Sequence, residues 1–181
     1  MFKMAIMAIV AVIVSATTDA SGADLCRQYV DNNEYDRAID ECSRMLTVAS
    51  YPAIEVFNNR GIAYAGKQQF DKAVSDYSRA ISLNPKFDKA YVNRGNAYWH
   101  LGKYEESFAD YQMAIKLNPE DPNAYYNMAC KHALRKNDSE ACAWLQKAVE
   151  KGFRQWEFIK KDSDLDAIRT APCYGEIMSG K

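Results

Sequence analysis

An internal repeat constrains the fold of this chain more than any other feature of its sequence. Residues 54–87 and 88–121 align without gaps, so that every position of the first copy has its counterpart in the second. The same short segments return at the same place in both copies: Asn-Arg-Gly at 59–61 and 93–95, Asp-Tyr at 76–77 and 110–111, and Leu-Asn-Pro at 83–85 and 117–119. A period of 34 residues is typical of proteins in which each copy buries its apolar face against its neighbours.

Two weaker copies flank this pair. One begins at Pro122 and spans 122–152, and a degenerate one spans 22–52, where Tyr-Asp-Arg-Ala-Ile at 35–39 matches Phe-Asp-Lys-Ala-Val at 70–74. Apolar and small residues recur three or four positions apart in each copy, which predicts amphipathic helices. The Asn-Pro pairs then end the second helix of each full copy, because Pro disfavours helical backbone in the residue before it.

This pattern resembles the tetratricopeptide repeat. The small residue that the family has at repeat position 8 is Gly61, Gly95 or Ala129 in successive copies. Its aromatic residue at position 24 is Tyr77 or Tyr111, and its closing Pro at position 32 is Pro85 or Pro119. Ser107 departs from the family's Ala at position 20, and Cys26 stands where Gly is usual. The resemblance covers roughly residues 22–152 and implies an all-α fold, a right-handed α-solenoid of helical hairpins. Residues 153–181 are expected to form a C-terminal helical cap.

The resemblance also implies a peptide-binding groove, because the first helix of each hairpin lines the concave face in this family. The residues at the ligand-facing positions are Asn58, Asn59, Ile62, Val92, Asn93, Asn96, Trp99, Tyr126 and Asn127. Three of these asparagines, Asn59, Asn93 and Asn127, hold the same position in successive copies and form a ladder of amides suited to the backbone of an extended peptide. Trp99 is the expected anchor, since large aromatic residues dominate interface energetics. Alternatively, these three asparagines cap the backbone between repeats and contact no ligand.

A two-carboxylate clamp, with which co-chaperone repeats hold an acidic C-terminal motif, is not expected. The positions that need Lys or Arg carry Asn58, Asn123 and Asn127, and only Lys89 is basic.

The N-terminus has the pattern of a secretory signal peptide over residues 1–20. Lys3 precedes an apolar run over 5–14, and small residues follow it. That run is too short for a membrane span, which takes about 20 apolar residues. Cleavage after Ala20 or Ala23 would give a periplasmic or secreted protein with no membrane span. The alternative is an uncleaved buried or anchoring helix.

Five cysteines would meet an oxidising compartment after export. In the repeat frame Cys26 and Cys42 face each other in the first hairpin, which predicts a disulfide between them, although their offset makes the Cα distance borderline. Cys130 pairs with Cys142, or one of the two pairs with Cys173, or they are small buried apolar residues. An odd number leaves at least one thiol free or paired between chains.

Several function classes lack support. The formal net charge is −1 and no Lys/Arg run could neutralise phosphates, which argues against nucleic-acid binding. No metal-ligand spacing, phosphate loop or nucleophile motif occurs, so neither a cofactor nor an enzymatic activity is expected.

The predicted function is that of a protein- or peptide-binding scaffold or assembly adaptor that acts after export. Two alternatives remain: a thiol-dependent redox or cofactor-delivery protein, which thiol titration would reveal, and a self-associating structural module, which light scattering would reveal. The sequence names neither the partner nor the oligomeric state.

Overall fold

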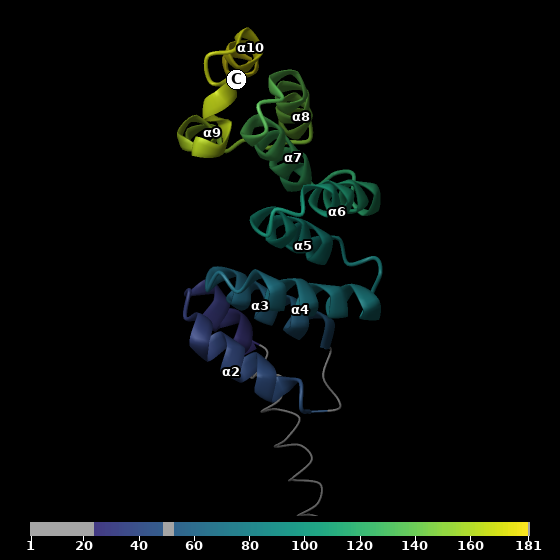
Figure 1. The fold of residues 1–181 in the computed structure, drawn as a ribbon. Coiled ribbons are helices and arrows are strands. Elements are labelled where there is room, and N and C mark those ends of the chain that lie inside the picture. Colours follow the sequence, from purple (N-terminus) through teal and green to yellow (C-terminus); the bar gives the residue numbers. More distant parts are fainter. Residues whose placement is uncertain (1–23, 49–52, 181) are drawn as a thin grey trace, which may run out of the picture. The chain divides into compact units, whose positions relative to one another are not determined.

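A computed structural model describes residues 24–48 and 53–180 of the chain, and in this part all regular secondary structure is helical (Figure 1). The predicted all-α fold is therefore confirmed. The predicted signal peptide and its cleavage site lie outside the described residues.

The helices follow the repeat frame closely. Residues 24–31 are helical, and the further elements are α2 (Tyr35–Met45), α3 (Ala53–Gly66), α4 (Phe70–Leu83), α5 (Asp88–His100), α6 (Tyr104–Leu117), α7 (Pro122–Leu134), α8 (Asp138–Glu150), α9 (Trp156–Lys161), the 3-10 helix η1 (Ser163–Ile168) and α10 (Pro172–Ser179). Asp121 caps the start of α7 by accepting a hydrogen bond from the backbone N–H of Asn123, and Pro122 occupies the first turn of that helix.

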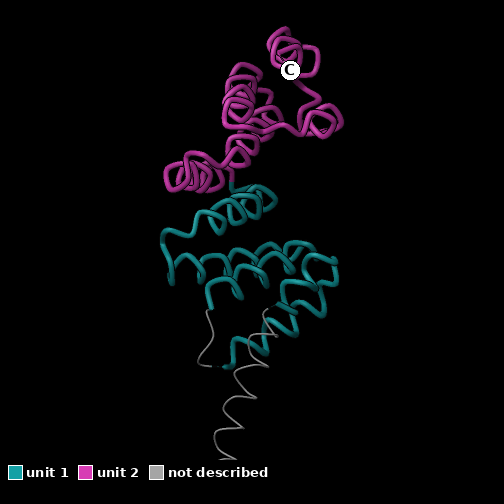
Figure 2. Tube along the Cα trace, turned by 180° about the vertical axis from the view of Figure 1, so that it is seen from behind, with its two compact units in different colours: residues 1–103 teal, residues 104–181 magenta. Residues whose placement is uncertain are grey.

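The chain divides into two compact units, residues 1–103 and 104–181 (Figure 2). The division falls between α5 and α6, so it cuts the repeat copy over 88–121 and does not follow the boundaries between copies.

Unit 1 is held together by helices that pack in chain order, α2 against α3, α3 against α4 and α4 against α5. The small residue at Gly61 makes room for an aromatic ring: a Cβ atom there would lie 2.5 Å from Cε1 of Tyr77. Tyr77 is fully buried and packs with Ala73 and Ala97. The space beside Gly61 therefore holds the Tyr77 ring.

A disulfide joins Cys26 to Cys42 across the first hairpin, with a Cα–Cα distance of 5.3 Å. This distance lies within the usual range for disulfides. The bridge is buried with Met45 and Val56 in one apolar cluster.

Unit 2 contains one large apolar core, to which the C-terminal segment contributes. Phe153 and Ile159 are buried there, and Trp156 packs against them, whereas 52% of Phe158 is exposed. A second disulfide joins Cys142 on α8 to Cys173 on α10, with a Cα–Cα distance of 6.1 Å. The C-terminal segment therefore covers the last hairpin, as expected of a cap.

The repeat period continues into this cap. Helix α9 begins at Trp156, one full period after α7 begins at Pro122, and α10 begins at Pro172, one full period after α8 begins at Asp138. The stretch that corresponds to α7 is broken, since α9 ends at Lys161 and Asp162 caps the separate helix η1. Helix η1 packs mainly against α7. The cap is thus a further repeat whose first helix has been split.

Candidate functional site

A cavity of about 630 Å³ lies in unit 1 between α3 and α5. It is lined by Tyr35, Ile62, Ala65, Gly66, Gln68, Phe70, Tyr77, Asn93, Asn96, Ala97 and His100. Three of the predicted groove residues, Ile62, Asn93 and Asn96, are in this lining. The structure therefore brings part of the predicted groove together around one space.

Helical spacing explains which side chains reach the cavity. Ile62, Ala65 and Gly66 are three or four positions apart on α3, and Asn93, Asn96 and Ala97 have the same spacing on α5. Residues at this spacing share one face of a helix. Helix α3 thus turns a small and apolar face towards the space, and α5 contributes the amide side chains.

Aromatic rings form other parts of the wall. The rings of Phe70 and His100 are stacked, with centroids 4.5 Å apart and an angle of 7° between their planes. The Tyr35 ring lies so close against Gly66 that a Cβ atom there would overlap it. The Tyr35 hydroxyl donates a hydrogen bond of 2.6 Å to Oδ1 of Asn33. Packing and this hydrogen bond therefore hold the wall in place before any ligand binds.

The prediction that Asn58 faces a ligand is corrected by its burial. Only 6% of Asn58 is exposed, and its Oδ1 accepts a hydrogen bond of 2.9 Å from Nδ2 of Asn93. This contact links α3 to α5 through the two side chains. Asn58 therefore orients the amide of Asn93.

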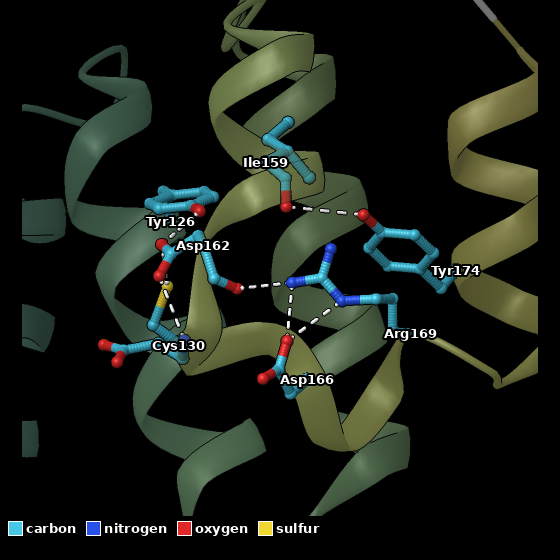
Figure 3. Close-up of polar contacts among 8 residues, drawn as sticks. Tyr126, Cys130, Ile159, Asp162, Asp166, Arg169 and Tyr174 are labelled. Atoms are coloured by element: carbon cyan, nitrogen blue, oxygen red, sulfur yellow. Dashed lines mark hydrogen bonds and ion pairs between the residues drawn. The ribbon is translucent and has the colours of Figure 1, made fainter.

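Tyr126 is also corrected, because the chain's own cap covers it (Figure 3). Only 5% of Tyr126 is exposed, and its ring stacks on Phe153 with centroids 4.2 Å apart. Its hydroxyl donates a hydrogen bond of 2.6 Å to Oδ2 of Asp162. A ligand cannot reach Tyr126 while the cap is in place. The prediction failed because the sequence does not show where η1 folds back.

The remaining groove residues, Asn59, Val92, Trp99 and Asn127, are half-buried and do not line the cavity. Their assignment to a ligand stays a prediction.

Arg169 fixes the loop that presents Asp162 (Figure 3). Its guanidinium donates to the backbone carbonyl of Asp162 at 2.9 Å and to Oδ1 of Asp166 at 2.6 Å. Beside this loop, Nζ of Lys131 lies 3.1 Å from Oδ2 of Asp164. These contacts hold η1 against α7.

Cys130 is free and buried in the described structure. Burial, and then the nearby Asp162 carboxylate, raise the pKa of its thiol far above the ordinary value. A reactive cysteine requires the opposite shift. With Cys142 and Cys173 joined, the described residues offer no accessible low-pKa thiol for the redox alternative.

An ion pair between α3 and α4 was missed in the sequence. Arg60 donates to both carboxylate oxygens of Asp76, at 2.7 and 2.8 Å, and to Oγ of Ser43 at 3.0 Å. The hydrogen bond with Asp76 raises the pKa of Arg60. Arg and Asp recur at these positions in the next copy, so their repetition was a signal that could have identified the pair.

Within the described part of the chain, no group of His, Cys, Asp and Glu residues is arranged to hold a metal ion. No helix there is long and apolar enough to cross a membrane.

Comparison with known proteins identifies the repeats. A model of the tetratricopeptide repeat matches residues 88–121, and residues 61–102 match a second model described as a TPR repeat. The heat shock protein STI1 of Saccharomyces cerevisiae is 28% identical over 58 residues, which cover 32% of this chain. The match spans only 10% of the yeast protein.

Solved structures agree with this match. The structure of MamA has a TM-score of 0.66 at 21% identity, with 78% of this chain and 82% of MamA covered. The second TPR domain of Spaghetti (RPAP3), bound to the HSP90 peptide SRMEEVD, has a TM-score of 0.53 at 30% identity, with 56% of this chain and 87% of that domain covered. The chain belongs to the tetratricopeptide-repeat family, whose fold is an all-α solenoid of helical hairpins.

Proposed function

We propose that this protein is a binding scaffold that holds an extended segment of a partner protein in the cavity of unit 1. The observation that carries the proposal is the space between α3 and α5, which Ile62, Asn93 and Asn96 line together. Peptide binding is known for a structural neighbour, the Spaghetti (RPAP3) domain with its HSP90 peptide. Catalysis has no part in this proposal.

The chemistry of the cavity suits an extended peptide. Ligand sites are mostly apolar, with a few polar groups that fix orientation. Here the amides of Asn93 and Asn96 provide the polar groups, and each hydrogen bond to a peptide backbone contributes about 0.5–1.5 kcal/mol net. Such a small number of bonds gives weak binding, so the apolar and aromatic wall must supply most of the affinity.

The partner differs from the one recognised by the structural neighbour. SRMEEVD ends in acidic residues, whereas the clamp positions in this chain carry Asn58, Asn123 and Asn127. We expect this chain to bind SRMEEVD at least tenfold more weakly than peptides selected on the chain itself. Fluorescence anisotropy with labelled peptides measures both affinities, and equal affinities would contradict this expectation.

A peptide library displayed on phage tests the proposal. We expect peptides to be enriched on the full chain and to bind Asn96→Ala about two- to tenfold more weakly, as the loss of one such hydrogen bond implies. The matched control is Gln112→Ala, which removes an exposed amide from α6 and is expected to leave the affinity unchanged. Equal loss in both variants, or no enrichment at all, would contradict the proposal.

We also propose that the protein acts after export, in the periplasm or outside the cell. Two disulfides support this, since such bonds persist in oxidising compartments. Mass spectrometry of the purified protein after alkylation in denaturant tests it. One cysteine is expected to react before reduction and five after it, in a chain that has been cleaved after Ala20 or Ala23. Retention of residue 1 together with five reactive thiols before reduction would contradict export.

A further inference from the structure

The cavity of unit 1 also indicates which kind of side chain a bound peptide places in it, an inference that rests on the proposed function. Among the described residues that line the cavity, none is Lys, Arg, Asp or Glu. Lys67, which directly follows the end of α3, is paired with the carboxylate of Asp36. A charged side chain placed in the cavity would meet no Lys, Arg, Asp or Glu of opposite charge among the described lining residues, where His100 is the one ionisable side chain besides the Tyr residues. Any loss of its hydration would then be costly.

Aromatic rings approach the space from separate elements. Tyr35 belongs to the start of α2, Phe70 to the start of α4, and His100 to the end of α5. The Phe70 and His100 rings are stacked on each other, and the Tyr35 ring packs closely against Gly66. Aromatic pairs favour offset-stacked or edge-to-face geometry, with centroids about 4.5–7 Å apart, and gain more than the burial of area alone. These walls therefore favour a ring over an aliphatic chain.

Small residues leave the room that a ring needs. Ala65 and Gly66 on α3 face Ala97 on α5 across the cavity. The volume of about 630 Å³ lies inside the range of roughly 300–1,000 Å³ found for ligand sites. An aromatic side chain of a peptide and the peptide backbone beside it both fit in this volume. Asn93 and Asn96 line the cavity, so their amides can hydrogen-bond to that backbone.

We propose that this cavity is a side-chain pocket for an uncharged aromatic residue of the bound peptide, and that it excludes peptides with Asp or Glu at that position. The aromatic residue fixes the register of the peptide. The amides of α5 then bind the backbone beside it. Specificity comes from shape and the absence of charge, in contrast to recognition of an acidic terminus.

Peptides selected from the phage library test the pocket from the ligand side. We expect the enriched peptides to share one Phe, Tyr or Trp. Synthetic versions with that residue changed to Ala are expected to bind the full chain at least tenfold more weakly, and versions with Glu at least a hundredfold more weakly. Calorimetric titration measures these affinities.

Filling the cavity tests it from the protein side. Ala65→Leu adds volume at a lining position and is expected to weaken the same peptides at least tenfold. Ala143→Leu makes the same change at an exposed position on α8 and is expected to have no effect. Circular dichroism checks that both variants fold. If Ala65→Leu does not fold, the peptide substitutions still test the pocket.

The outcomes separate the two proposals. Peptides that lose affinity on Asn96→Ala, yet share no aromatic residue or tolerate its change to Glu, would overturn the aromatic pocket and leave peptide binding standing. A library that yields no peptide above background would overturn peptide binding itself.

Discussion

At the scale of single residues, the largely buried ion pair between Arg60 and Asp76 should be costly to break. Their side chains are 19% and 7% exposed. Removing one partner of a buried pair leaves an uncompensated charge, so Asp76→Ala is expected to cost about 3 kcal/mol of unfolding free energy. The matched control is Glu34→Ala, which breaks an ion pair whose side chains are 69% and 37% exposed and should cost at most about 1 kcal/mol. Urea denaturation measures both, and similar costs would contradict a special role for Arg60.

Gly61 should tolerate no side chain. In Gly61→Ala the new methyl group would meet the Tyr77 ring at 2.5 Å, and overpacking of this kind costs about 1–3 kcal/mol. Gly175→Ala is the control, because nothing lies within 4 Å of a Cβ atom there and Ala gains about 0.5–1 kcal/mol over Gly inside a helix. Thermal unfolding should therefore shift in opposite directions in the two variants. Equal shifts would contradict the packing described for Tyr77.

His132 should make unit 2 less stable in mild acid. Burial lowers its pKa, and nearby Arg135 also lowers it, while Glu140 opposes the shift. The unfolded chain then binds a proton at a higher pH than the folded chain, so stability falls as the pH drops through the ordinary value of 6.5. In His132→Phe this loss disappears. Urea midpoints at two pH values, one above and one below 6.5, measure the difference, and an unchanged pH dependence in the variant would contradict it.

The sequence was informative where a residue type has one physical use. Gly61 had to mark a close approach, and Cys26 and Cys42 stood opposite each other in the repeat frame. It misled at Asn58 and Tyr126, which occupy ligand-facing positions of the family. In this chain Asn58 is hydrogen-bonded to Asn93, and Tyr126 is hydrogen-bonded to Asp162. An amide or a phenol serves a ligand and an internal contact equally well, so only the structure separates the two uses.

At the scale of elements, the C-terminal cap keeps the repeat period without keeping the repeat's residues. Helices α9 and α10 begin where a further hairpin would begin, but Asp162 interrupts the first helix. The aromatic and apolar residues of this segment predicted a cap. They did not predict this register, since the family's small and aromatic positions are not met there. The fold of η1 onto α7 depends on Arg169 and Asp162, which no repeat pattern singles out.

The disulfide between Cys142 and Cys173 should hold α10 to α8. It closes a loop over a sequence separation of 31 residues, and the entropic model assigns such a loop about 4 kcal/mol. Cys173→Ala is expected to lose most of this stabilisation, and amide hydrogen exchange in α10 is expected to become faster. Cys130→Ala, which removes the free buried thiol and keeps the bridge, should leave exchange in α10 close to that of the unaltered protein. Equal exchange in all three proteins would contradict a tethering role.

At the scale of the whole molecule, the fold class followed from the amphipathic spacing within each copy together with the resemblance to the tetratricopeptide repeat. One helical hairpin cannot bury its apolar face alone, so neighbouring copies must stack. The division into two units within one repeat copy and the cavity of unit 1 did not follow from it. That cavity combines Tyr35, Phe70 and His100, which come from three different copies; Tyr35 and Phe70 hold matching positions, whereas His100 does not. Its shape depends on packing between copies, which a comparison of the copies does not contain.

Hydrogen–deuterium exchange of the full chain, with and without a saturating selected peptide, shows where the peptide binds. We expect slower exchange in α3 and α5, around Ile62 and Asn96, and unchanged exchange in α9 and α10. Protection confined to the C-terminal cap, or spread evenly over the chain, would contradict a binding site in the cavity of unit 1.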